Sequence, residues 1–152
     1  MGPGDFLGKR RVFFVVWTHL RRENMGLFQQ IFTVMVVEDS APQLKLIDKM
    51  LTRIEGVKSI LCSDIFEAYA VLQAYSKVDM LVLDVNLPFA GGLSLLAKLR
   101  SMGRFAELPI LISTAEQDVA MLHGKGSSGL LVKPYDAGQL KTFVDAFRNV
   151  QP

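Results

Sequence analysis

The sequence predicts an α/β domain built on a doubly wound, five-stranded parallel sheet with helices on both faces. From Thr33 onward, short apolar runs alternate with helix-length stretches, which is the pattern of strands joined by helical crossovers. The longer stretches carry apolar residues at spacings of three and four, which form one face of a helix. Three of the apolar runs end directly in charged residues. Open sheets of this kind bind their ligands at the carboxyl ends of the strands.

The elements follow from these runs in chain order. The predicted strands cover residues 33–37, 57–62, 79–85, 108–114 and 129–133, and the predicted helices cover residues 42–55, 64–76, 92–102 and 136–150. Ser40 is expected to cap the first helix, with Pro42 in its first turn and Gly56 as its stop. Residues 116–128 show a weaker helical pattern that several glycines interrupt. Each crossover is expected to be right-handed.

Length and charge indicate one domain preceded by an extension. The 152 residues are enough for one domain with a substantial core, which we assign to residues 33–150. Residues 1–32 do not follow the alternating pattern, and they carry five basic and two acidic side chains. Residues 33–152 carry twelve basic and thirteen acidic side chains. A nearly neutral domain lacks the basic surface that nucleic-acid binding needs, so no nucleic-acid partner is expected.

Membrane association and export are not expected. Spanning a bilayer takes about 20 apolar residues, and the apolar run at residues 12–17 is far shorter. The two arginines before that run superficially resemble a twin-arginine export signal, but no small-residue cleavage site follows. Cys62 is the single cysteine of the chain and falls in a predicted strand, which suits a reducing compartment. We therefore expect a cytoplasmic protein.

Acidic residues follow two of the predicted strands. Glu38 and Asp39 come directly after the first strand, and Asp84 stands at the end of the third. A carboxylate at the end of a buried strand is costly without partners or a metal. Mg²⁺ takes hard oxygen ligands and usually one or two carboxylates, and it relieves the repulsion between neighbouring carboxylates. The sequence therefore predicts a magnesium site formed by Glu38, Asp39, Asp84 and the backbone carbonyl of Asn86.

Two further polar residues are predicted at the same edge of the sheet. Lys133 ends the fifth strand, where its amine can pair with Asp84 or with a phosphoryl group placed there. Thr114 ends the fourth strand, where its hydroxyl can donate a hydrogen bond to a phosphoryl oxygen. Together with the carboxylates, these residues indicate a site for a divalent metal and a phosphate.

These motifs resemble the receiver domain of two-component response regulators, including the chemotaxis regulators. The matching features, in order, are Glu38-Asp39, Asp84 before Asn-Leu-Pro, Gly92 at the start of a helix, Ser113-Thr114-Ala115, and Lys133-Pro134. The resemblance implies strand order 2-1-3-4-5, a cis Lys133–Pro134 bond and bound Mg²⁺. It also implies that Asp84 accepts a phosphoryl group, which Thr114 senses and Lys133 contacts. Such a domain is a signalling switch in a phosphorelay and not a conventional enzyme.

The resemblance also implies partners. A histidine kinase or a histidine phosphotransfer protein would supply the phosphoryl group, and a further protein would respond to it. One departure concerns the switch itself, because the family often has Tyr or Phe three residues before its lysine, and this chain has Leu130. The alternatives are a receiver that belongs to a larger hybrid kinase or regulator, and a receiver-like interaction module that is not phosphorylated. A flavin enzyme is disfavoured, since the acidic loop at Glu38 would repel a flavin phosphate.

Overall fold

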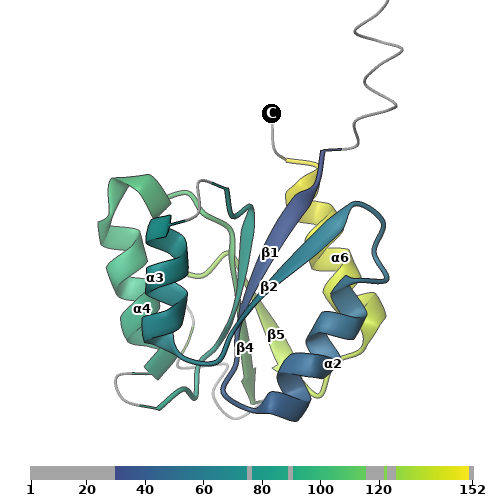
Figure 1. The fold of residues 1–152 in the computed structure, drawn as a ribbon, viewed down its shortest axis with the longest axis horizontal. Coiled ribbons are helices and arrows are strands. Elements are labelled where there is room, and N and C mark those ends of the chain that lie inside the picture. The colour runs from purple at the N-terminus through teal and green to yellow at the C-terminus, as the bar shows by residue number, and fades with distance from the viewer. Residues whose placement is uncertain (1–29, 75–76, 89–90, 116–121, 123–125, 151–152) are drawn as a thin grey trace, which may run out of the picture. The chain divides into compact units, whose positions relative to one another are not determined.

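Five parallel strands form one twisted sheet at the centre of the domain (Figure 1). The computed structural model describes residues 30–74, 77–88, 91–115, 122 and 126–150. The strands are β1 (Phe32–Val37), β2 (Val57–Cys62), β3 (Met80–Asp84), β4 (Ile110–Ala115) and β5 (Gly129–Lys133). Their order is β2-β1-β3-β4-β5, and every neighbouring pair is parallel. The predicted fold class and strand order are confirmed.

Helices cover both faces of this sheet. Helices α3 (Ile65–Ala74) and α4 (Gly91–Ser101) lie on one face, and α2 (Ala41–Leu51) and α6 (Ala137–Arg148) lie on the other (Figure 1). A short 3₁₀ helix, η1 (Gly103–Phe105), follows α4. The weak helix predicted over residues 116–128 falls largely outside the described residues. Among the described residues, no helix is both long and apolar enough to cross a membrane.

Helix boundaries differ from the sequence prediction where side chains bond to the backbone. Helix α2 ends at Leu51, four residues before the predicted end, and the Thr52 hydroxyl donates to the carbonyl of Asp48 at 2.9 Å. Ser40 occupies the position before α2, but its side chain makes no capping bond. Helix α6 has a stronger start, because Asp136 and Gln139 form a reciprocal capping box.

Each face of the sheet has its own core, since side chains alternate along a strand. The core under α3 and α4 includes Met35 from β1 and Leu83 from β3. The core under α2 and α6 includes Val36 from β1 and Val82 from β3. All six residues of β1 and all five of β3 are buried, as expected for central strands covered on both faces.

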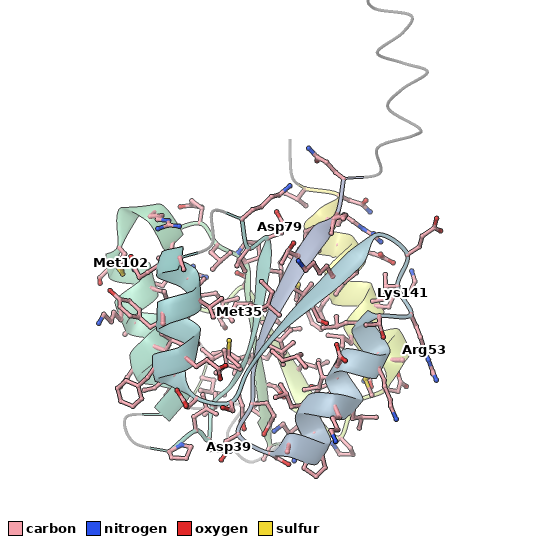
Figure 2. All side chains as sticks on the ribbon, viewed as in Figure 1. Met35, Asp39, Arg53, Asp79, Met102 and Lys141 are labelled. Atoms are coloured by element: carbon pink, nitrogen blue, oxygen red, sulfur yellow. The ribbon has the colours of Figure 1, made fainter. Side chains whose placement is uncertain are left out.

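Acidic side chains at the two ends of the sheet have different surroundings. Figure 2 shows Asp79 and Asp39 at opposite ends. Asp79 is buried at the amino end, where its carboxylate accepts a hydrogen bond from the backbone N–H of Thr33 at 2.7 Å. This bond helps hold β1 against the segment that enters β3. Asp39 is exposed at the carboxyl end, where the predicted site lies.

Candidate functional site

Alternation along the strands brings the predicted charged residues onto one face of the sheet at its carboxyl edge. Glu38, Asp84 and Lys133 each stand two positions after a residue of the core under α2 and α6, namely Val36, Val82 and Leu131. Positions two apart on a strand share a face. Glu38 follows β1 and Asp84 ends β3, and these two strands are neighbours in the sheet. Lys133 ends β5, which is separated from β3 by β4.

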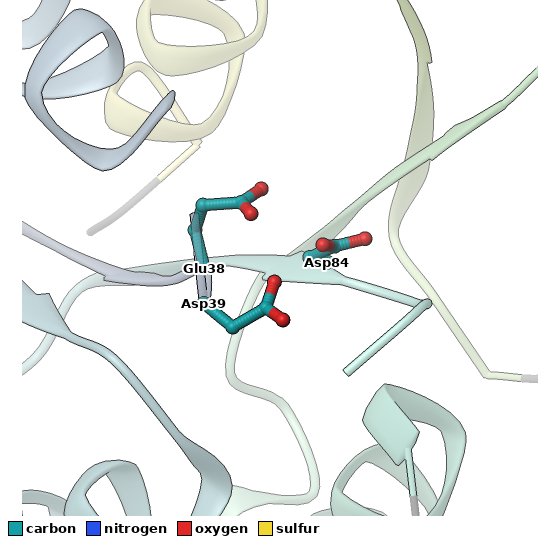
Figure 3. A group of neighbouring side chains, drawn as sticks. All are labelled: Glu38, Asp39 and Asp84. Atoms are coloured by element: carbon teal, nitrogen blue, oxygen red, sulfur yellow. The ribbon is translucent and has the colours of Figure 1, made fainter. Parts of the chain in front are cut away.

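Three carboxylates gather at this edge. One oxygen each of Glu38, Asp39 and Asp84 lies within 4.8 Å of the others. In Figure 3, the side chains of Glu38 and Asp39 reach from the end of β1 toward Asp84 at the end of β3. Glu38 and Asp84 are buried, whereas Asp39 is exposed and opens the cluster to solvent. Three hard oxygen donors with one open side suit Mg²⁺, which keeps several of its waters.

The amine of Lys133 lies between two of these carboxylates. Its Nζ is 3.0 Å from Glu38 Oε2 and 3.5 Å from Asp84 Oδ2. The lysine side chain is 25% exposed, so water reaches it only in part. One cation thus compensates two buried anions, and the cluster keeps a net negative charge when all of its acids are ionised.

Burial shifts the pKa values of the pair formed by Glu38 and Lys133. Burial raises the pKa of Glu38, and the hydrogen bonds from Ser40 and Lys133 offset this only in part. Burial lowers the pKa of Lys133, but its hydrogen bond to Glu38 and the attraction of Asp84 outweigh this effect, so the pKa is raised overall. The lysine therefore remains a cation at neutral pH.

Backbone groups orient both buried carboxylates. The N–H of Ser40 donates to Glu38 Oε1 at 3.0 Å, and the N–H of Asn86 donates to Asp84 Oδ1 at 3.0 Å. Each carboxylate therefore uses one oxygen for a backbone N–H and directs the other toward Lys133. Asn86 is exposed just beyond β3. The role of its backbone carbonyl oxygen as a metal ligand stays a prediction.

The Thr114 hydroxyl bonds to the backbone next to it. The residue is fully buried on β4, and its hydroxyl donates to the carbonyl of Ala115 at 3.3 Å. Leu130, which stands where the resemblance suggests an aromatic residue, is partly buried on β5 and packs against the core under α3 and α4.

Two hydroxyl residues beside the cluster were not identified from the sequence. Ser113 pairs in register with Asp84 on the neighbouring strand, so the two side chains share a face. Tyr135 follows the cis Lys133–Pro134 bond and packs against the core under α2 and α6. Its place next to Thr114 on the fourth strand could have indicated Ser113, but the sequence does not show which of the two side chains shares a face with Asp84. Nothing local to the sequence distinguishes Tyr135 from an ordinary core aromatic.

A pocket adjoins the cluster on the side of α2. It has a volume of about 290 Å³ and lies between α2 and the segment Lys133, Pro134 and Tyr135. The helix contributes Gln43, Leu46, Ile47 and Met50, so the lining is mainly apolar. Lys133 therefore borders both the carboxylate cluster and an apolar surface that is open to solvent.

Comparison with known proteins identifies the family. The pattern of the response regulator receiver domain matches residues 34–145, which is most of the chain. The chain belongs to the response regulator receiver domain family. The predicted resemblance is confirmed, and with it a role in two-component signalling. Receiver domains accept a phosphoryl group from a kinase partner, and they are not conventional enzymes.

Similar receiver proteins have chemotaxis functions in their names. The chain is 33% identical to chemotaxis protein CheY1 of Helicobacter pylori over 112 residues, which cover 71% of the chain and 90% of that protein. It is 29% identical over 111 residues to a chemotaxis protein CheY homologue of Campylobacter jejuni, covering 71% of the chain and 85% of that protein. Among solved structures, it is similar to chemotaxis response regulator CheY4 of Vibrio cholerae. That similarity has a TM-score of 0.70 and 25% identity, and it covers 78% of the chain and 99% of CheY4.

Proposed function

We propose that this receiver domain is a phosphoacceptor switch in which Asp84 takes the phosphoryl group. The observation that carries the proposal is the position of Asp84 beside two further carboxylates and 3.5 Å from the Lys133 amine. In the reaction, an Asp84 carboxylate oxygen forms a bond to phosphorus as the bond between phosphorus and the donor's leaving atom breaks. The donor leaves as a neutral imidazole or a free carboxylate. Positioning and charge neutralisation are the main protein contributions to such a transfer.

The carboxylates of Glu38, Asp39 and Asp84 fit a bound Mg²⁺, to which the backbone carbonyl of Asn86 would add a further oxygen ligand. When bound, the ion neutralises negative charge on the transferring phosphoryl group. Lys133 adds a second positive charge 3.5 Å from Asp84, and its raised pKa keeps that charge in place. Phosphorylation replaces the single negative charge of the Asp84 carboxylate with a phosphoryl group that carries about −1.5 to −2 charges, which draws Lys133 away from Glu38.

Thr114 would report the new phosphoryl group. Its hydroxyl now bonds to its neighbour's carbonyl at 3.3 Å, a long and therefore weak bond. A phosphoryl oxygen is a stronger acceptor, so we expect the hydroxyl to turn toward it and the loop after β4 to follow. With Leu130 in place of an aromatic residue, this loop movement would carry the signal.

We infer that the phosphoryl donor is a histidine kinase or a histidine phosphotransfer protein in the cytoplasm. Membership of the receiver family supports a kinase partner, and the apolar pocket between α2 and Lys133 offers surface for it next to the phosphoacceptor. Residues 33–150 would form the receiver, and residues 1–32 an extension to which we assign no role. The downstream partner would be a protein, with neither nucleic acid nor membrane contacted directly.

Intact-protein mass spectrometry after incubation with acetyl phosphate tests the assignment. We expect a mass gain of one phosphoryl group that requires Mg²⁺ and is lost in Asp84→Asn. Asp64→Asn is the matched control, since Asp64 follows β2 at the same edge and caps α3 with a carboxylate oxygen that an amide oxygen replaces. Labelling that persists in Asp84→Asn would contradict the assignment. An unlabelled wild-type protein that also fails to bind Mg²⁺ would favour an interaction module that is not phosphorylated.

A further inference from the structure

Helix α2 presents basic side chains to solvent. Lys45, Lys49 and Arg53 stand four positions apart in the chain, and all three are exposed. Residues four apart on a helix are neighbours on its surface, so the two lysines lie side by side. Arg53 follows just beyond the carboxyl end of the helix. Together these three residues are the basic stripe of α2.

The basic stripe has no acidic partner within the part of the chain that the structure describes. None of its three side chains forms an ion pair with a described residue. Asp48 is the single acid of α2, and its carboxylate accepts a hydrogen bond from the Ser59 hydroxyl on β2 at 2.5 Å. Like charges one turn apart on a helix repel each other. The stripe is therefore a local excess of positive charge on a domain that is nearly neutral as a whole.

The same helix borders the apolar pocket described above. Leu46 lines this pocket and is 53% exposed although it is apolar. Lys49 stands three positions after Leu46, so the two side chains are neighbours on the helix surface. Pro134 and Tyr135 line the pocket from the segment after β5. The volume of about 290 Å³ lies just below the range of about 300–1,000 Å³ for small-molecule sites, so it suits a few side chains of a partner.

An apolar groove with a basic edge selects a partner by charge as well as by shape. An amphipathic helix binds such a groove through apolar side chains spaced three and four residues apart. Acidic side chains beside those anchors would meet the basic stripe, and basic ones would be repelled. Asp39 precedes α2 and Arg53 follows it, as Figure 2 shows. The acids of the partner would therefore lie toward the carboxyl end of α2, away from the carboxylate cluster.

We propose that the groove between α2 and the segment after β5 docks an amphipathic helix of a partner protein, with acidic side chains on the basic stripe. Leu46 and the pocket beside it receive the apolar side chains of that helix, and Lys49 pairs with an acid next to them. The inference goes beyond the proposed function of Asp84, because docking requires neither Mg²⁺ nor a phosphoryl group.

Two synthetic helical peptides test the groove. Both carry leucines four residues apart, and the adjoining face carries glutamates in one peptide and lysines in the other. We expect the acidic peptide to shift the amide resonances of α2 and Tyr135 saturably in nuclear magnetic resonance spectra of the whole chain. The basic peptide should bind at least about ten-fold more weakly. In about 1 M salt, where the screening length is about 3 Å, most of this difference should disappear.

Single substitutions separate the charge from the apolar surface. Lys49→Glu should weaken binding of the acidic peptide at least about three-fold and strengthen binding of the basic one, because the sign of the contact is reversed. Leu46→Gln should weaken binding of both peptides. Lys98→Glu is the matched control, since Lys98 is exposed on α4 over the other face of the sheet. Its affinities should stay within about two-fold of wild type.

Several outcomes would overturn the docked helix. They are equal affinity for the two peptides, shifts confined to other elements, and a Lys98→Glu variant as weak as Lys49→Glu. A dimer that Leu46→Gln dissociates in the ultracentrifuge would instead assign the groove to a second copy of the chain. Binding to phosphatidylserine vesicles without binding to either peptide would assign the stripe to a membrane surface.

Labelling of Asp84 by acetyl phosphate is measured separately from peptide binding. A protein that becomes labelled but binds neither peptide would overturn the docked helix alone. A protein that binds the acidic peptide but is never labelled would overturn the proposed function alone.

Discussion

The amine of Lys133 lies 3.0 Å from Glu38 Oε2 and 3.5 Å from Asp84 Oδ2, and so joins β5 to both central strands that carry the acids. Glu38 and Lys133 are 95 positions apart in the chain. Parallel topology brings them together, because every strand delivers its carboxyl end to the same edge. The lysine is thus the main internal counter-ion of two buried carboxylates.

Removal of this cation should destabilise the metal-free protein and increase the effect of Mg²⁺. In Lys133→Met, two buried carboxylates lose their shared partner, so we expect the free energy of unfolding to fall by about 1–3 kcal/mol. Denaturant unfolding with and without Mg²⁺ measures both effects, and the added stability from Mg²⁺ should be larger in the variant than in wild type.

Lys141→Met is the matched control for this substitution. Lys141 pairs with Asp145 one turn along α6, where the lysine is 56% exposed, and Figure 2 shows its side chain at the surface. An exposed pair of this kind contributes about 0.2–1 kcal/mol. Equal losses from the two lysine variants would show that Lys133 does not compensate the buried acids.

Stability should depend on pH through Glu38. Its pKa is raised above the ordinary value of 4.5, chiefly by burial, so the folded protein holds this proton more tightly than the unfolded chain does. The contribution of Glu38 to stability is therefore lost as the pH rises from about 4.5 through its raised pKa. In the metal-free protein, the stability of Glu38→Gln relative to wild type should be higher at pH 7.5 than at pH 4.5.

Paired denaturant curves at the two pH values measure this difference, and Glu55→Gln provides the control. Glu55 is exposed, so its substitution should give nearly the same stability difference at both pH values. If Glu38→Gln lost stability relative to wild type between pH 4.5 and pH 7.5, the raised pKa of Glu38 would be contradicted.

The sequence was sufficient for the fold because its apolar runs are separated by regular helical stretches, and the runs that form β1 and β3 are buried throughout. The same runs located Glu38, Asp84 and Lys133, because the carboxyl ends of parallel strands meet at one edge of the sheet. The end of α2 could not be predicted in this way. Ile54 continues the apolar spacing of the helix and is buried, but it lies in a turn that follows the end of α2 at Leu51.

Relationships between strands explain what sequence reasoning missed at the site. Ser113 matters because of its register with Asp84, and register is set by pairing partners that are distant in the chain. Thr114 was predicted to act at the same edge, but its hydroxyl bond to Ala115 could not be derived from its position.

Arg100 should be a major stabilising residue at the opposite end of the sheet. Its Nη1 donates to the carbonyls of Phe105, Ala106 and Leu108 at 3.0, 3.1 and 2.8 Å, and its Nε donates to the carbonyl of Gly126 at 2.7 Å. These bonds hold the segments that enter β4 and β5. Bonds to a charged donor are stronger than neutral ones, so Arg100→Met should lower the free energy of unfolding by about 2–3 kcal/mol.

Arg100→Lys should recover little of this stability, because an ammonium group cannot reach carbonyls on both sides as the planar guanidinium does. Arg53→Met is the control, since Arg53 is exposed beyond the end of α2 and its substitution should change stability by at most about 0.5 kcal/mol. If Arg100→Lys were as stable as wild type, the positive charge alone, and not the several N–H donors of the guanidinium, would hold these segments.

Gly92 is required where α4 approaches the phosphoacceptor strand. A Cβ at this position would lie 2.1 Å from the backbone carbonyl oxygen of Asp84, and the N–H of Gly92 donates to the carbonyl of Val85 at 3.1 Å. Because backbone cannot yield as a flexible side chain does, Gly92→Ala must displace either α4 or the end of β3. We expect a loss of about 1–3 kcal/mol in the free energy of unfolding, as overpacking usually costs.

The same displacement should affect function, because Asp84 moves relative to Glu38 and Lys133. Gly92→Ala should therefore slow phosphorylation by acetyl phosphate even under conditions where the variant is fully folded by circular dichroism. Gly103→Ala is the matched control, since a Cβ there meets nothing within 4 Å and the change should alter stability by less than about 1 kcal/mol. If Gly92→Ala were as stable and as rapidly labelled as Gly103→Ala, the close approach of α4 would not determine the position of Asp84.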